Sequence, residues 1–361
     1  MELNALQRTT KETIERKINE GIYEFEEVDC PVCRHQRFVG ISEKDRYGLY
    51  FPVKICTTCG LIQTAPRMTQ EAYNEFYNSE YRRLYEGRLN ASPESFQLQY
   101  QRGQRIVAYL SQFWGKSPED SLVLEVGCGS GGVLRAFQEQ GFLVKGIDLG
   151  EEYVHYGQET YGLDLEVSTL AGLHLDRPPD IIVYSHVMEH ILDLPAEFAE
   201  IRKVLDKNGL LFIEVPGVKF IQYTYGGDFL RLLQNAHTYH FTLQSLTNLA
   251  QVNGFHRLSG DEYVRATFML EAAGMASSNE IVNEYPNILS FLQSVEFEYM
   301  LVQAVAHLQQ DRYAQAAIYF AELVEMQPEL PYLYRLFALA LDRLGRTEDA
   351  NRIRHAVATL V

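Results

Sequence analysis

The chain has 361 residues and a formal net charge of −16 at pH 7, with 32 Lys and Arg against 48 Asp and Glu. This length exceeds that of a typical single domain and predicts two or three domains. The acidic balance argues against nucleic acid or an anionic membrane as the main partner. The chain contains no apolar run long enough to span a bilayer, and its first residues lack the basic and apolar regions of a signal peptide. We therefore predict neither a membrane span nor secretion.

The first segment, residues 1–27, is predicted to contain one short amphipathic helix over residues 3–20. Its apolar positions are Leu3, Leu6, Ile14 and Ile18. A helix with one apolar stripe is expected to pack on the body of the protein.

Four of the five cysteines form two C-x-x-C pairs within residues 28–65. Cys30 and Cys33 are separated from Cys56 and Cys59 by 22 residues, and residues 38–53 have the pattern of short hairpin strands. Two such pairs are typical of a zinc ribbon, in which four thiolates hold the ion tetrahedrally. Because four protein ligands leave no open position, we predict a structural zinc site, with iron as the main competing metal. The paired thiols also indicate a reducing, cytoplasmic environment.

Residues 66–120 are rich in aromatic residues and are predicted to be helical. Tyr73, Tyr77, Tyr81 and Tyr85 follow one another at a spacing of four. On a helix this spacing places them on one face. We expect most of this face to pack on the next domain, with Tyr81 as a candidate contact to a substrate.

The central feature of the chain is an apolar strand at 122–126 followed by a glycine-rich turn, a helix and a second strand that ends on Asp148. Gly127, Gly129 and Gly131 allow a sharp turn that lies close to a ligand. The following helix offers unpaired N–H groups and a positive end to a polar ligand. Asp148 comes 19 residues after Gly129, where a carboxylate can hold both hydroxyls of a ribose. This pattern predicts a nucleoside site at the carboxyl edge of a parallel sheet.

Two cofactors fit this turn. Gly127, Gly129 and Gly132 also satisfy the G-x-G-x-x-G pattern of NAD-binding domains. However, Glu125 interrupts an otherwise apolar strand, and a carboxylate there suits the cationic amine of S-adenosylmethionine. We predict S-adenosylmethionine, with Cys128 as a small residue of the cofactor loop rather than a nucleophile.

From residue 121 to about 275 the pattern alternates between strands and helices, which predicts an α/β domain with a mostly parallel sheet. A sixth strand and an antiparallel seventh strand follow the parallel ones, which is unlike an NAD domain and typical of class I methyltransferases. The expected strands are 122–126, 144–147, 165–167, 181–185, 210–215, 254–264 and 265–272.

The last segment, residues 276–361, is predicted to be helical and contains an internal repeat. The stretch that begins at Tyr313 aligns with the stretch that begins at Thr347, at the 34-residue period of tetratricopeptide repeats. Since two such units rarely stand alone, we expect this segment to dock on the preceding domain, on a second copy of the chain or on a protein partner. The apolar residues expected to need such covering are Leu323, Leu336, Phe337 and Leu341.

These motifs together resemble a family of bacterial class I methyltransferases that carry an N-terminal zinc-binding domain. The resemblance covers roughly residues 28–275 and includes the cysteines, the aromatic segment and the glycine turn. Two further segments belong to it, His186 to His190 and His237 to Thr242. It implies a Rossmann-like fold and S-adenosylmethionine-dependent methylation of a small molecule or glycan, such as a sugar or natural product. Relatives that methylate sugars at carbon have a further α/β domain at the C-terminus, where this chain has helices.

Removal of a proton from the acceptor points to the histidines near the carboxyl edge of the sheet, since imidazole is the natural base near neutral pH. We predict that His240 or His237 is the general base. His186 is expected to touch the cofactor, and His190 to have a structural role. Tyr223 and Tyr225, in an aromatic loop before these histidines, are expected to contact the acceptor.

Two other functions compete with the methyltransferase. One is a zinc-ribbon oxidoreductase that uses NAD, although alcohol dehydrogenases bunch their four cysteines closely. The other is a non-catalytic adaptor that acts through its helical repeats, which the intact Glu125, glycine turn and Asp148 argue against.

Overall fold

The computed structural model describes residues 3–85, 87, 91–271 and 280–358. The chain forms two compact units, one made of Met1–Phe220 with Leu230–Pro286 and the other of Ile221–Phe229 with Asn287–Val361. Within the described ranges no helix is both long and apolar enough to cross a membrane.

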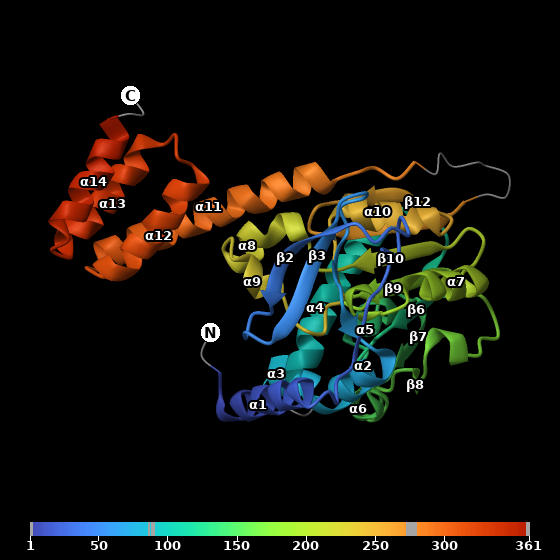
Figure 1. The fold of residues 1–361 in the computed structure, drawn as a ribbon. Helices are drawn as coiled ribbons and strands as arrows, with labels where there is room; N and C mark the ends of the chain where they lie inside the picture. The colour runs from blue at the N-terminus through green and yellow to red at the C-terminus, as the bar shows by residue number, and fades with distance from the viewer. Residues whose placement is uncertain (1–2, 86, 88–90, 272–279, 359–361) are drawn as a thin grey trace. The chain divides into compact units, whose positions relative to one another are not determined.

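The first unit is built around a seven-stranded sheet (Figure 1). Its order is β12-β13-β10-β9-β6-β7-β8, in which β13 runs antiparallel to both of its neighbours and the five strands from β10 to β8 are parallel. This arrangement confirms the Rossmann-like α/β class and the antiparallel final pair. The strands are Leu122–Val126 (β6), Leu143–Asp148 (β7), Leu165–Val167 (β8), Ile181–Ser185 (β9), Leu210–Glu214 (β10), Phe255–Gly260 (β12) and Arg265–Leu270 (β13).

Helices cover both faces of this sheet because successive strand residues are apolar on both sides. On β9, Ile182 and Tyr184 belong to one buried cluster, whereas Ile181 and Val183 belong to another. The first cluster includes residues of α7 (Leu194–Val204) and α10 (Leu243–Val252), and the second includes residues of α4, α5 and α6. These last helices span Pro93–Leu110, Gly132–Gln138 and Glu151–Tyr161.

The cysteine-bearing segment forms a second, four-stranded antiparallel sheet in the same unit. The predicted hairpin strands are present as β2 (Phe38–Lys44) and β3 (Tyr50–Cys56), followed by β4 (Ile62–Thr64). The fourth strand was not predicted: β11 (Tyr239–His240) pairs with β4, although it lies far along the chain. The predicted N-terminal helix is present as α1 (Ala5–Asn19). The short strand β1 (Phe25–Glu26) pairs with β5 (Arg67–Met68).

The four evenly spaced tyrosines lie on one continuous run of helical turns made of α2 (Gln70–Phe76), a π-helical stretch (Tyr77–Tyr81) and α3 (Arg82–Tyr85). Their rings follow one another along this run, with the first three stacked and Tyr85 tilted against Tyr81. The ring centroids of Tyr77 and Tyr81 are 4.6 Å apart with nearly parallel planes, and those of Tyr73 and Tyr77 are 5.9 Å apart.

The second unit is helical. It contains α8 (Ile221–Tyr225), most of α11 (Tyr285–Gln309), α12 (Tyr313–Met326), α13 (Pro331–Arg343) and α14 (Thr347–Ala358). The starts of α12 and α14 have the offset of the sequence repeat. One residue of α9 (Phe229–Leu232) also falls in this unit.

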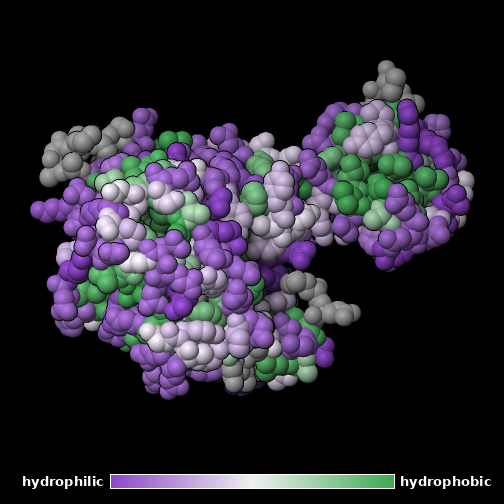
Figure 2. Space-filling view, turned by 180° about the vertical axis from the view of Figure 1, so that it is seen from behind, coloured by the Kyte–Doolittle hydropathy of each residue, from purple (hydrophilic) through white to green (hydrophobic). Residues whose placement is uncertain are grey.

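The helices of the second unit bury their own apolar residues. Leu323 and Leu341 are 0% and 2% exposed, within a cluster made only of residues from α11 to α14, and Leu336 and Phe337 pack against that cluster. The expectation that Leu323 and Leu341 require a docking partner is therefore wrong, whereas Leu336 and Phe337 are only partly buried within the unit. Figure 2 shows apolar residues gathered on one face of this unit. Among the large aliphatic side chains of α11 and α12, Val302 is 64% exposed and Ile318 is 61% exposed.

Candidate active site

The glycine turn after β6 is held tightly against the next strand. The N–H groups of Gly127 and Cys128 both donate to the carbonyl of Ile147, at 2.8 and 3.0 Å. Gly127, Gly129 and Gly131 have φ angles of 70°, 55° and 82°, a region that disfavours other residues. A Cβ on Gly127 would lie 2.4 Å from the side chain of Val187, so the turn requires glycine there for space as well.

Asp148, the last residue of β7, is fixed beside this turn. Its Oδ2 accepts from the N–H of Gly129 at 2.8 Å, and its Oδ1 accepts from the N–H of Gly150 at 2.7 Å. Each carboxylate oxygen keeps a further lone pair for a ligand hydroxyl. The predicted pairing of the glycine turn with this carboxylate is therefore present in the structure.

Glu125 lies beneath the turn and has an unsatisfied carboxyl oxygen. The side chain is 2% exposed, and its Oε2 has no hydrogen-bond partner in the described chain. Burial raises the pKa of Glu125 well above its usual range, even though the charge of Arg102 opposes this shift. A buried polar atom without a partner is unfavourable, so a cationic ligand group at this position would relieve it.

Cys128 contributes its backbone and not its thiol. The side chain is 2% exposed, and its Sγ donates to the carbonyl of Gly129 at 3.6 Å. A Cβ on Gly146 would lie 2.8 Å from this sulfur, so the thiol fills the space between the loop and β7. Burial raises the pKa of Cys128 well above its usual value, which makes it a poor nucleophile.

The sequence analysis missed Gln99, a residue of α4 that reaches the same turn. Its Oε1 accepts from the hydroxyl of Ser130 at 3.2 Å and from the N–H of Gly132 at 3.4 Å. The helix can approach this closely because Gly103 faces the next helix, where a Cβ would lie 2.7 Å from Cα of Val133. A single Gln in an amphipathic helix carries no sequence signal for such a contact.

Charged side chains continue along the carboxyl edge of the sheet as one row. Arg102 Nε lies 3.7 Å from Glu214 Oε1, which lies 3.4 Å from Nε2 of His186. Nδ1 of His186 is 3.5 Å from Oε1 of Glu189, and the same oxygen is 3.9 Å from Nε2 of His237. His186 has a φ of 59°, so it leaves the end of β9 in a conformation that is unusual for a non-glycine residue.

The histidines in and beside this row differ in the direction of their pKa shifts. Burial lowers the pKa of His186, but the contacts of its ring with the carboxylates of Glu189 and Glu214 outweigh this and raise the pKa overall. Burial lowers the pKa of His237 well below its usual value, and burial together with the charge of Arg46 lowers the pKa of His240 to about 3. The lowered pKa values of His237 and His240 favour their neutral forms, whereas the raised pKa of His186 favours its charged form.

His237 and His240 lie close together, and the aromatic segment reaches them. Their ring centroids are 6.2 Å apart, and the ring of His190 is 4.8 Å from that of His237. Tyr77 and Tyr81 contact His190 edge-on, at 5.9 and 5.7 Å. The candidate residue Tyr81 is thus near the histidines that the sequence singled out.

The segment that carries these histidines is fastened by the N-terminal part of the chain. Its strand β11 pairs with β4 of the cysteine-bearing sheet, and the N–H of Thr64 donates to the carbonyl of Thr238 at 2.9 Å. The hydroxyl of Tyr73 donates to the carbonyl of Ala236 at 2.8 Å. The hydroxyl of Tyr85 accepts from the N–H of Asn235 at 2.7 Å. At the far end Thr242 caps α10 through Ser245, as the sequence indicates.

Tyr223 and Tyr225, the other predicted acceptor contacts, lie on α8 in the helical unit. Tyr223 is 78% exposed.

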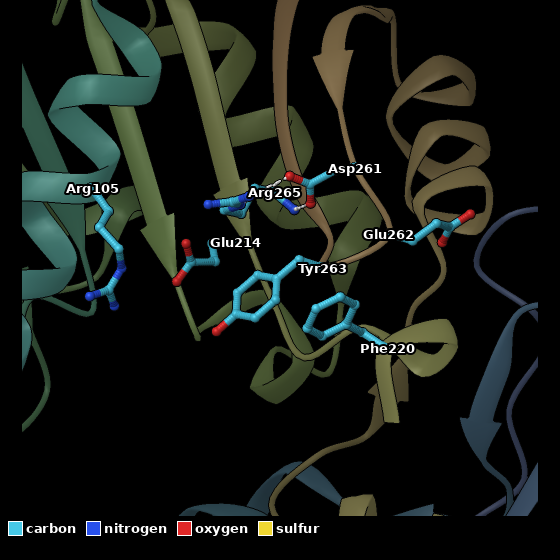
Figure 3. A pocket seen from close by; sticks show the side chains of 7 residues that line it. All are labelled: Arg105, Glu214, Phe220, Asp261, Glu262, Tyr263 and Arg265. Atoms are coloured by element: carbon cyan, nitrogen blue, oxygen red, sulfur yellow. Dashed lines mark hydrogen bonds and ion pairs between the residues drawn. The ribbon is translucent and has the colours of Figure 1, made fainter. Parts of the chain in front are cut away.

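A pocket of about 400 Å³ lies at the end of β10 (Figure 3). Figure 3 shows Arg105 of α4 on one side and Phe220 with Tyr263 on another, with Glu214 between them. The rings of Phe220 and Tyr263 meet edge-on with centroids 5.1 Å apart. Because Glu214 also contacts His186, this pocket adjoins the charged row. The remaining lining residues are Asp261, Glu262 and Arg265.

The four cysteines of the two knuckles converge at the end of the four-stranded sheet. Their sulfur atoms all lie within 4.8 Å of one another, and the pairs Cys30–Cys59 and Cys33–Cys56 are 3.4 Å apart. Tetrahedral zinc with bonds of about 2.3 Å places sulfurs about 3.8 Å apart, so this group has the size that zinc requires. None of the four forms a disulfide. Hydrogen bonds from Cys30 and Cys59 lower the pKa of Cys56, which favours the thiolate form that binds metal.

Comparison with known proteins identifies the region that carries this site. Residues 98–259 match the family model of a methyltransferase domain. A stretch of 96 residues is 28% identical to the ubiquinone biosynthesis O-methyltransferase of Pelagibacter ubique, covering 25% of this chain and 40% of that enzyme. The chain therefore contains a methyltransferase domain, and it spans less than half of this curated relative.

Two solved structures illustrate the same likeness. The 1,6-didemethyltoxoflavin-N1-methyltransferase of Burkholderia thailandensis, with bound S-adenosylhomocysteine, is 17% identical and has a TM-score of 0.43; the match covers 59% of this chain and 96% of that one. The magnesium protoporphyrin IX methyltransferase of Synechocystis PCC 6803 is 20% identical with a TM-score of 0.40, covering 56% and 100%. At these scores neither structure assigns a substrate to this chain.

Proposed function

We propose that the chain is an S-adenosylmethionine-dependent methyltransferase that acts on a small molecule or glycan. The observation that carries this proposal is the pair of carboxyl groups around the glycine turn. Glu125 is buried with an unpaired oxygen, and Asp148 is held by two backbone N–H groups. The domain match over residues 98–259 supports the same activity.

In this proposal each residue of the turn has a defined task. Glu125 binds the amine of the methionine part, which supplies the positive charge that its buried carboxyl lacks. Asp148 accepts hydrogen bonds from the ribose hydroxyls. Gly127, Gly129 and Gly131 keep the turn free of side chains so that the nucleoside lies against the backbone. The cofactor supplies an electrophilic methyl group when bound, and the chain must align an acceptor atom with it.

His186 is the best placed of the histidines to take a proton from the acceptor. Its side chain is 29% exposed, whereas the side chain of His237 is 6% exposed. An effective base has a pKa near the working pH, and His240, whose pKa falls to about 3, is too weak a base to meet this condition. We therefore assign proton removal to His186 and propose that His237 and His240 are positioning residues. The sequence instead predicts His240 or His237 as the base.

The pocket beside Glu214 is our candidate for the acceptor site. Phe220 and Tyr263 offer ring faces and edges of the kind on which a sugar or planar ring packs. Arg105 and Glu214 provide polar partners for hydroxyl or acidic groups. This mixture favours a polar small molecule or a glycan and matches the expected class of acceptor. Tyr81, Tyr223 and Tyr225 remain proposed further contacts.

Calorimetry with S-adenosylhomocysteine and with NADH separates this proposal from its alternatives. We expect the full chain to bind S-adenosylhomocysteine and not NADH. Glu125→Gln removes the buried charge that faces the ligand amine and should weaken binding at least tenfold, whereas Glu139→Gln on the exposed end of α5 should not. Binding of NADH alone would favour an oxidoreductase, and binding of neither ligand would favour a non-catalytic adaptor.

The acceptor is best sought in metabolite extract from a strain that lacks the gene, using S-adenosylmethionine with a labelled methyl group. A His186→Gln variant should retain cofactor binding and lose label transfer. If His240→Gln abolishes transfer and His186→Gln does not, the base is assigned to the wrong histidine.

We further propose that Cys30, Cys33, Cys56 and Cys59 hold a structural zinc ion in the cytoplasm, where thiols stay reduced. Four protein ligands leave no position for a substrate, so the ion would fix the four-stranded sheet and take no part in chemistry. The helical unit, with its 34-residue repeat, is proposed to be tetratricopeptide-like and to bind a protein partner or a second copy of the chain. Light scattering on a chain ended after residue 286 tests self-association, because this chain keeps all of the first unit and removes the second unit from Asn287 onward.

A further inference from the structure

Glu189, His190 and His237 form a second group of metal-ligating side chains, separate from the four cysteines. One ligand atom from each of them lies within 4.8 Å of the other two. Oε1 of Glu189 is 3.9 Å from Nε2 of His237, and the two imidazole rings are 4.8 Å apart between centroids. These are distances at which three side chains can share one ion after small rotations.

The polar atoms of this group lack partners in the described part of the chain. Both carboxylate oxygens of Glu189, Nδ1 of His190 and Nδ1 of His237 are buried and make no hydrogen bond. Glu189 is 1% exposed and His237 is 5% exposed. A carboxylate that is removed from water without a hydrogen bond is strongly unfavourable, and so many unpaired atoms in one place require a common explanation. A cation at their centre would satisfy the carboxylate and both imidazoles at once.

The protein backbone fixes these ligands relative to one another. The N–H of Thr238 donates to the carbonyl of Glu189 at 2.8 Å, which ties the segment after β9 to the segment of His237. The side chain of Gln234 forms a hydrogen bond with Nε2 of His237, so Nδ1, which has no hydrogen-bond partner in the described chain, is the nitrogen left to bind an ion. The rings of Tyr77 and Tyr81 pack edge-on against His190 and help to hold its imidazole in place.

The chemistry of the donors identifies the class of ion. Calcium and magnesium prefer sites made of oxygen atoms, whereas two imidazoles and one carboxylate are typical of zinc and other divalent transition metals. Three protein ligands also leave positions open, in contrast to the four thiolates of the ribbon.

We propose that Glu189, His190 and His237 bind a divalent transition-metal cation of the Zn²⁺ class in an open, three-ligand site. The ion would lie next to His186, whose Nδ1 is 3.5 Å from Glu189. An acceptor oxygen could then occupy an open position, a step that rests on the proposed methyl transfer, whereas metal binding itself does not.

The test is a Co²⁺ titration of the full chain that retains its tightly held zinc, after dialysis against a mild chelator. Calorimetry should report one Co²⁺ bound per chain in addition to the zinc. The visible spectrum of the bound Co²⁺ should show the weak absorption bands typical of nitrogen and oxygen ligands and no sulfur-to-metal charge-transfer band. Glu189→Gln should weaken Co²⁺ binding at least about 100-fold, because a direct ligand matters at least as much as an outer contact. The exposed His155→Gln is the matched control and should bind Co²⁺ normally.

A folding defect in the variant can be distinguished from a loss of metal binding. Because Glu189 also lies 3.5 Å from Nδ1 of His186, the melting temperature of Glu189→Gln is measured beside that of the unaltered chain, and Co²⁺ binding is compared at a temperature where both are folded. Binding of S-adenosylhomocysteine, measured in parallel, reports on the proposed function independently of the metal. The proposal is overturned if the unaltered chain binds no Co²⁺ beyond the cysteine site, or if Glu189→Gln binds it equally well.

Discussion

Replacement of Tyr85 by Phe tests how the N-terminal part of the chain holds the histidine segment. The hydroxyl accepts from the N–H of Asn235 at 2.7 Å and donates to Oδ2 of Asp45 at 2.7 Å. Phe keeps the ring, which packs against Tyr47, so only the hydroxyl is lost. Both of its partners are buried, with Asn235 at 6% and Asp45 at 3% exposure.

The expected loss of stability follows from these two partners. A buried group left without its hydrogen bond costs about 1–3 kcal/mol, so two such groups should lower the free energy of unfolding by about 2–6 kcal/mol. Tyr100→Phe is the control, because the hydroxyl of Tyr100 bonds to Glu139 at the surface. That variant should change the free energy of unfolding by about 0.5 kcal/mol or less.

The effect should also depend on pH. Burial raises the pKa of Asp45, and the hydrogen bond from Tyr85 opposes this rise, so the variant should raise this pKa further. A carboxyl whose pKa is higher in the folded state stabilises the fold at pH values below its unfolded pKa. That stabilisation is lost as the pH rises through the folded pKa. The penalty of Tyr85→Phe should therefore be larger at pH 7 than near pH 4.

Urea unfolding followed by fluorescence measures this penalty directly. Trp114 is the single tryptophan of the chain and lies in the first unit, where its Nε1 donates to the hydroxyl of Ser121. A loss below about 0.5 kcal/mol, or a loss that does not shrink at low pH, would refute the reasoning.

Three further predictions follow from the sites already described. Cys56→Ser should remove a zinc ligand and lower both the metal content and the melting temperature; less than half a zinc per unaltered chain, with melting unchanged by chelation, would contradict the ribbon assignment. Asp148→Ala should remove a charged hydrogen-bond acceptor worth about 1.5–3 kcal/mol, lowering the affinity for S-adenosylmethionine roughly 10- to 100-fold in calorimetry, and an unchanged affinity would place the ribose elsewhere. Phe320→Ala should destabilise the helical unit by about 3–5 kcal/mol, because the ring is 0% exposed. The control Ile318→Ala, at a position that is 61% exposed, should have little effect. Thermal unfolding followed by circular dichroism measures both.

The sheet of the first unit could be predicted from sequence because its strands are short apolar runs between clear helices and turns. Leu122–Val126 and Ile181–Ser185 begin and end where the pattern places them. The glycine turn with Asp148 was equally readable, since its conformation requires specific residue types at fixed spacing. Such local requirements restrict the residue types at fixed positions and can therefore be recognised in the sequence.

The strand Tyr239–His240 could not be predicted in the same way. Two residues carry no periodicity, and their pairing with β4 depends on tertiary packing between distant segments. For the same reason the group of Glu189, His190 and His237 was not recognised as one site, although its histidines were noted individually. Leu323 and Leu341 need no docking partner because they pack on the neighbouring helices of their own unit, a tertiary contact that the repeat pattern does not specify.

The pairing of β4 with β11 also has a consequence for the order in which the protein can fold during synthesis. The cysteine-bearing strands leave the ribosome roughly 175 residues before Tyr239 does. At about 5–20 residues per second, the edge of β4 therefore waits about 10–35 s for its partner. An unpaired strand edge is a site for misassociation, so early metal loading or a chaperone should matter most in this interval. For the same reason the ribbon is not a transferable cassette, and grafting residues 28–65 onto another protein should expose this edge permanently.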